Sequence, residues 1–211
     1  MSAMLELPDR AALRPALPGL ALAVLTLLFG FGLGGVFGLN EDAIKSRLSA
    51  SAAAVQASVY QGDHAAAQAV VAKSWTYMQR AHLHAGSLGT AAVVLTILVV
   101  LLGASPGVTR AISIGLGAGA LGYSVFWMWA GFLAPSLGST GAAKEALRWL
   151  AVPSSGAILV ATSAAAVLCV LPLIRRRRPP EACPGGPFSR VVPAAARGSP
   201  PPGGCGCAAS G

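Results

Sequence analysis

The stretch "AGSLGTAAVVLTILVVLLGASPGVTRAISIGLGAGALGYSVFWMWAGFLA", residues 85–134, decides the fold class. Its only charged residue is Arg110, which separates two apolar runs, 85–105 and 111–134. Each run is long enough to cross a hydrocarbon core of about 30 Å as an α-helix, which needs roughly 20 apolar residues. The runs are continuous and do not alternate with polar residues, so they are not barrel strands. The stretch therefore predicts two transmembrane helices joined by a short turn.

Two further runs without Asp, Glu, Lys, Arg or His lie at 17–39 and 150–174. The chain of 211 residues is 55% hydrophobic and only 10% charged, whereas a soluble domain carries about 25% charged residues. The first run exceeds the usual core of a signal peptide and lacks an A-x-A site, so we expect a retained anchor. The sequence predicts an all-α protein, a four-transmembrane-helix bundle.

The segments between the spans have their own predicted structure. Residues 1–16 precede the first span, and residues 40–84 form an extracytoplasmic helical hairpin that runs into the second. Asn40 and Asp63 are the expected N-caps of its two helices, and Gly62 is the break between them. Residues 140–149 form a short amphipathic helix before the fourth span. The basic, Pro/Gly-rich tail, residues 175–211, is predicted to be disordered.

The basic residues predict the orientation, because cytoplasmic segments carry an excess of Lys and Arg. With both termini in the cytoplasm, nine basic residues lie inside and six outside, and "RRRR" at 175–178 directly follows the last span. The formal net charge of +8 is concentrated in that tail, which favours lipid headgroups over nucleic acid as its partner. The Ala-, Gly- and Arg-rich composition suggests a bacterial inner membrane.

Small residues at i and i+4 mark two helices for close packing. Gly30, Gly34 and Gly38 form such a row in the first span, and Gly115 and Gly119 form another in the third. Lipid tails supply no hydrophobic drive for helix association, so glycine rows act by allowing backbones to approach. Two interpretations remain open, packing within one bundle or a face for other membrane subunits or a second copy.

The segment "MQRAHLHAGSLGT", residues 78–90, carries the candidate ligands for a metal or haem. His82 and His84 point about 200° apart on a helix, so one ion cannot take both without distortion. Met78 shares a face with His82 and offers a thioether to a soft ion such as copper. A haem would pair His82 or His84 with Met128 of the third span. The competing interpretation places both histidines at headgroup depth as a polar collar.

The remaining candidates carry weaker signals. Cys169 lies in the fourth span, and Cys205 and Cys207 form a C-x-C in the tail, with Cys183 nearer the membrane. No span contains a charged residue, and the chain lacks P-loop, H-E-x-x-H, G-x-S-x-G and C-x-x-C motifs. The sequence thus shows no evident catalytic machinery, and we expect an accessory or assembly subunit that packs through glycine-faced helices. The alternative is a copper- or haem-binding redox protein that uses His82 with Met78 or Met128. An enzyme of small molecules or lipids at the outer interface, built on Arg80, His84, Lys144 and Glu145, is a third possibility without specific support from the spacing.

Overall fold

The computed structural model describes residues 10–175, which are helices and turns without any strand. Four helices are long and apolar enough to cross a membrane, so an all-helical, multi-span membrane protein is confirmed. Arg175, the first residue of the predicted tail, ends α6, and the rest of the tail, with Cys183, Cys205 and Cys207, lies outside the described residues. In order, the elements are α1 Arg10–Leu13, a 3-10 turn Arg14–Ala16, α2 Leu17–Ala53, α3 His64–Leu101, α4 Pro106–Leu137, α5 Thr140–Ala146 and α6 Arg148–Arg175.

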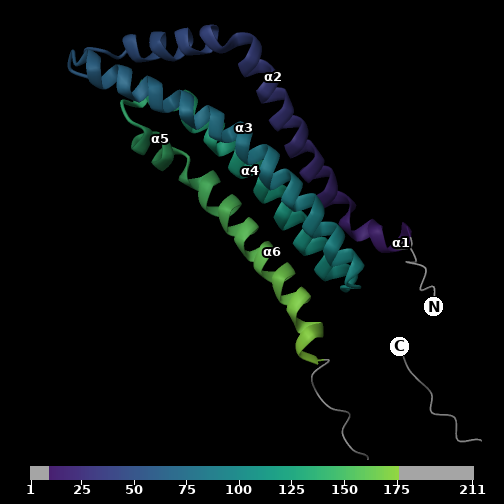
Figure 1. The fold of residues 1–211 in the computed structure, drawn as a ribbon. Coiled ribbons are helices and arrows are strands. Elements are labelled where there is room, and N and C mark those ends of the chain that lie inside the picture. The colour runs from purple at the N-terminus through teal and green to yellow at the C-terminus, as the bar shows by residue number, and fades with distance from the viewer. Residues whose placement is uncertain (1–9, 176–211) are drawn as a thin grey trace, which may run out of the picture. The chain divides into compact units, whose positions relative to one another are not determined.

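Helices α3 and α4 form a long antiparallel pair at the centre of this part of the chain (Figure 1). Helix α2 packs against both of them, whereas α6 packs chiefly along α4. Small buried side chains such as Ala23, Ala92 and Ala120 line these contacts, and small residues let helices approach closely in lipid. The arrangement is therefore a three-helix core of α2, α3 and α4, with α6 attached to one side of α4.

Helix α2 bends at Asn40, where the sequence predicts the start of a new helix. Asn40 has non-helical backbone angles, φ −132° and ψ 24°, yet the helix continues on both sides of it to Ala53. The Asn40 side-chain amide donates to the carbonyl of Val36, 3.3 Å away. Asn40 thus lies at a kink between two helical segments of α2, as the predicted helix start requires, and the second segment runs toward the turns that precede α3 (Figure 1).

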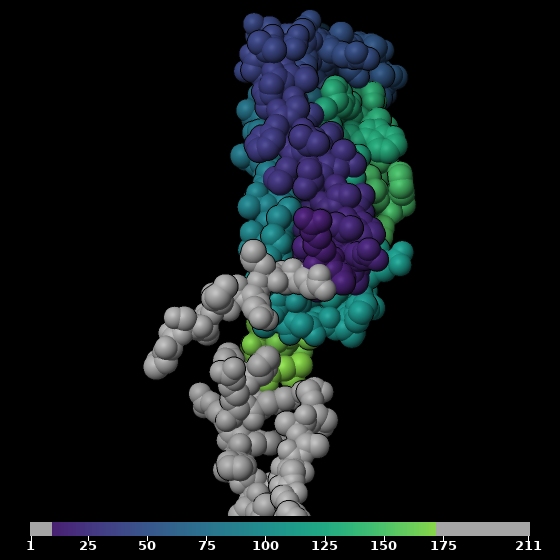
Figure 2. All heavy atoms as spheres, turned by 90° about the vertical axis from the view of Figure 1, so that its right-hand side faces the viewer, coloured from purple at the N-terminus to yellow at the C-terminus, as the bar shows by residue number. Residues whose placement is uncertain are grey.

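Residues 41–80 form a hairpin made of the last part of α2, turns at 54–63 and the first part of α3. Helix α3 begins after Asp63, whose carboxylate accepts from the amide of Ala66 at 2.9 Å. Inside the hairpin, Ala52, Tyr60 and Ala67 form a small buried cluster. The hairpin lies over one end of the bundle (Figure 2), where the Tyr60 hydroxyl donates to the carbonyl of Pro135 in α4 at 2.7 Å.

A turn between α4 and α5 also meets the hairpin. Gly138 ends α4 with a φ of 76°, a left-handed conformation that favours glycine. A Cβ at this position would collide with the side chain of Val59. Ser139 then caps α5 by accepting from the amide of Ala142 at 3.0 Å. The position of the hairpin is therefore set by contacts at both Tyr60 and Val59.

Candidate functional site

His82 faces α2, and its contacts explain two of the predicted glycines. Its Nδ1 atom lies 2.8 Å from the carbonyl oxygen of Gly30. A Cβ on Gly34 would lie 2.9 Å from the His82 Cε1 atom, and one on Gly30 would lie 3.0 Å from the Cβ of Ala85. Both glycines therefore bring α2 against α3, with the His82 ring in the interface.

The His82 ring also lines an open groove of about 400 Å³ between α2 and α3, which we call the α2–α3 groove. Glu41 pairs with Lys45 at the groove, and the Lys45 ammonium lies 5.3 Å from the centre of the Trp75 ring. Phe37 packs edge-on against Trp75. The remaining lining residues are Gly34, Gly38, Gln79 and Leu83.

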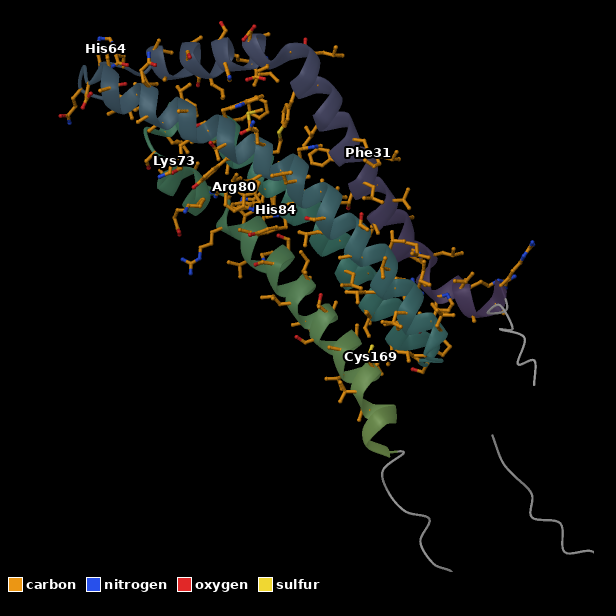
Figure 3. All side chains as sticks on the ribbon, in the orientation of Figure 1. Phe31, His64, Lys73, Arg80, His84 and Cys169 are labelled. Carbon is orange, nitrogen blue, oxygen red and sulfur yellow. The ribbon has the colours of Figure 1, made fainter. Side chains whose placement is uncertain are left out.

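His84 points to the other side of α3, toward α4. Its ring centre lies 5.2 Å from that of Tyr123 and 5.8 Å from that of Trp127. The Arg80 guanidinium lies over the rings of Tyr77 and Trp127, at 5.4 and 5.2 Å, and Arg80 and His84 follow each other along α3 in Figure 3. His82 and His84 thus contact different helices, as their spacing predicts, and are not brought together.

The two candidate methionines share one apolar cluster. Met78 is completely buried with Leu33, Phe37 and Leu48, and Met128 packs against the same cluster. The Met78 Cγ atom lies so close to Gly131 of α4 that a Cβ there would approach it to 2.6 Å. Neither methionine lines the α2–α3 groove. Among the described side chains, no three His, Cys, Asp or Glu residues gather as a metal-ligand group.

The glycine rows contact helices of the same chain at four of their five positions. Gly115 faces Ala161 of α6, with a Cβ-to-Cβ approach of 3.1 Å, and Gly119 faces Ile158 at 2.6 Å. Gly38 is different, because a Cβ there would meet nothing within 4 Å. Internal packing therefore accounts for Gly30, Gly34, Gly115 and Gly119 but leaves Gly38 unexplained.

A second groove, the α4–α6 groove, has a volume of about 370 Å³ and is lined by apolar side chains. It arises because α6 packs along one side of α4. Val160 of α6 lines this groove and is 71% exposed. Most of the other lining residues are small, namely Ala111, Gly115, Ala157, Ala161 and Ala164.

The contacts between helices at these sites were not predicted from the sequence. Trp75 and Gln79 share a face of α3 with His82 by helical spacing, but Glu41 of α2 meets them at one groove because α2 and α3 pack in a particular register, which no spacing within one helix reveals. The predicted candidate Cys169 is half-buried on α6 and has no disulfide partner among the described residues.

The fold and its grooves define a multi-pass integral membrane protein. Its four long apolar helices meet the length and composition needed to cross a bilayer. No protein-family model, curated protein or solved structure matches the chain. The function must therefore be argued from the grooves themselves.

Proposed function

We propose that the protein is an accessory or assembly subunit of a bacterial inner membrane that binds a transmembrane helix of another membrane protein. The observation that supports this proposal is the α4–α6 groove, an apolar surface groove that the chain's own side chains do not fill. Ala157 and Ala164 are half-buried small residues of α6 along this groove, and between them Ala161 is buried against Gly115 of α4. Transmembrane helices associate by van der Waals contact along such strips of small residues.

The one-sided packing of α6 favours the same proposal. Fewer residues of its apolar window are buried, 17%, than in the corresponding window of α4, 44%. Because α6 contacts its own bundle on one side only, the rest of its apolar surface is free to contact a partner helix. Val160 lies on this surface, while the adjacent Leu159, which is 67% exposed, does not line the groove.

The proposed orientation places both termini in the cytoplasm and the hairpin outside. The arginines at 175–178 support it through the positive-inside rule. The hairpin carries Glu41, Asp42 and Asp63 as well as Lys and Arg residues. Its positive charge is therefore partly balanced, unlike that of the four arginines. A hairpin fixed to the bundle at Tyr60 supplies a second, extramembrane surface for the same partner.

Site-specific photocrosslinking in living cells tests the proposal. A photoreactive amino acid at Val160 should give one defined covalent product of higher mass, identified by mass spectrometry as another membrane protein; a product with a second copy of this chain would show self-association in its place. The same group at Leu159 is the matched control, since it is equally exposed but outside the groove. Lipid adducts alone at Val160, or equal protein products at both positions, would contradict the proposal.

A further inference from the structure

We propose that the α2–α3 groove binds a lipid-soluble 1,4-dihydroxylated aromatic ring of the quinol class, with His82 as the acceptor for one hydroxyl group. This site lies on the other side of the core from the α4–α6 groove and does not depend on the proposed partner. A partner at Val160 and a ligand at His82 can therefore each be present or absent on their own.

The bond between His82 and Gly30 determines what His82 offers to a ligand. A carbonyl oxygen only accepts hydrogen bonds, so the Nδ1 atom at 2.8 Å must be the donor. In the neutral imidazole, Nε2 then carries a lone pair and is an acceptor. The groove that His82 lines therefore presents an oriented acceptor, and the ligand must bring a donor such as a hydroxyl group.

The charges at the groove indicate that the ligand is neutral. Glu41, an acidic wall residue, disfavours an anionic ligand such as a phosphate. A cationic ligand is also disfavoured, because the Lys45 ammonium already pairs with Glu41 and lies over the Trp75 ring. The Glu41 carboxylate and the Trp75 face, which would otherwise attract a cationic ligand, are thus already occupied by Lys45.

A second polar side chain lines the same groove. Gln79 lines the groove three residues before His82 on α3, and side chains at i and i+3 have Cβ atoms about 5–6 Å apart. The two side chains thus start about one helical turn apart, and the flexible Gln79 amide can reach the far end of a ring that is hydrogen-bonded to His82. Two hydroxyl groups at opposite ends of such a ring match His82 and Gln79, whereas a lipid alcohol with a single hydroxyl group matches only one.

The shape of the groove suits a flat ring with an apolar tail. Gly34 and Gly38 add no side chains to the α2 wall beside Phe37 and Glu41, and only Gly34 is required by the packing of His82. Leu83, another lining residue, is 63% exposed, so the groove opens toward the lipid side of the helices. Its volume of about 400 Å³ falls within the range of small-molecule sites, about 300–1,000 Å³.

Filling the groove at Gly38 gives a direct test. Full-length protein in nanodiscs is titrated, under reducing conditions, with a decyl-substituted 1,4-hydroquinone, and its dissociation constant is measured. We expect saturable binding that weakens at least tenfold in Gly38→Leu. Gly35→Leu is the matched control, because a Cβ at Gly35 also meets nothing within 4 Å but Gly35 does not line the groove; its affinity should equal that of the unmodified protein.

Two further arms test the hydrogen bonds. The dimethyl ether of the same hydroquinone, which has no donors, should bind at least tenfold more weakly. His82→Asn, whose shorter side-chain amide keeps a donor near the position of Nδ1 for Gly30 but has no atom at the position of Nε2, should weaken hydroquinone binding about tenfold while the protein remains monodisperse. Equal affinities for hydroquinone and ether, no saturable binding, or no effect of Gly38→Leu would overturn the proposal. So would a Soret band or stoichiometric copper that Gly38→Leu removes, since these indicate a haem or metal in the groove.

Discussion

The hydroxyl of Tyr60 donates to the carbonyl of Pro135, a residue 75 positions further along the chain, at 2.7 Å. Both residues are buried. This bond joins the turns of the hairpin to α4, so the hairpin is part of the folded helical unit. Its loss would leave a buried carbonyl without this partner.

Replacing Tyr60 with Phe should lower the free energy of unfolding by about 1–3 kcal/mol, the usual cost of leaving a buried hydrogen-bonding group unpaired. The loss can be measured by titration with a denaturing detergent in mixed micelles. Ser58→Ala is the matched control, since Ser58 is an exposed turn residue whose hydroxyl contacts only the nearby Val55 carbonyl. Equal stabilities of the two variants would show that the hairpin is not held at Pro135.

The same bond predicts a dependence on alkaline pH. Burial raises the pKa of the Tyr60 hydroxyl above its ordinary value of 10.0. A group whose pKa is higher in the folded than in the unfolded state stabilises the fold below the unfolded pKa, and this stabilisation is lost as pH rises through the folded value. The difference in stability between the unmodified protein and Tyr60→Phe should therefore be constant near neutral pH and should shrink above about pH 10. A difference that grows there would contradict the assignment.

The close contact between Gly119 of α4 and α6 predicts a sharp effect of one methyl group. In Gly119→Ala the new Cβ would lie 2.6 Å from Ile158 and 2.8 Å from the backbone oxygen of Ser154. Because a backbone atom cannot move aside locally, α6 must shift, at a cost of about 1–3 kcal/mol. Gly156→Ala is the control, since a Cβ there meets nothing within 4 Å. Thermal unfolding in detergent compares the stabilities of the two variants. An unchanged stability of Gly119→Ala would show that α6 does not pack against Gly119 in this way.

The start of α3 gives a local prediction. Asp63→Ala removes the acceptor for the Ala66 amide and should cost about 1 kcal/mol of stability. Asp63→Asn keeps a side-chain oxygen at the same place and should retain most of it. Hydrogen exchange of the Ala66 amide should rise in the alanine variant only, and equal exchange in both would show that the cap does not protect this turn.

The sequence identifies those elements that composition and local chemistry determine. Four charge-free runs predict the long helices, and Asp63 caps α3 where a helix-start signal is expected. The opposed directions of His82 and His84 also follow from helical geometry. Each of these features depends on residues close together in one segment.

The features that the sequence does not show depend on contacts between helices. Asn40 lies at the junction of two helical segments, as predicted, but its side-chain amide donates to the carbonyl of Val36 in the preceding turn. The α2–α3 groove depends on the register that places Gly34 beneath His82, and the α4–α6 groove depends on α6 packing on one side of α4. Spacing within one helix contains no information on the register between two helices, so neither groove could be located beforehand.

Cysteine accessibility in intact cells tests the membrane arrangement most directly. In a background without native cysteines, one cysteine at Ala57 reports on the hairpin turns, and one at Gly107 reports on the junction between α3 and α4; both residues are exposed. With four spans and cytoplasmic termini, a membrane-impermeant maleimide should label position 57 in intact cells and position 107 only after permeabilisation. Equal labelling of both positions in intact cells would show that α3 does not cross the membrane and would contradict the account.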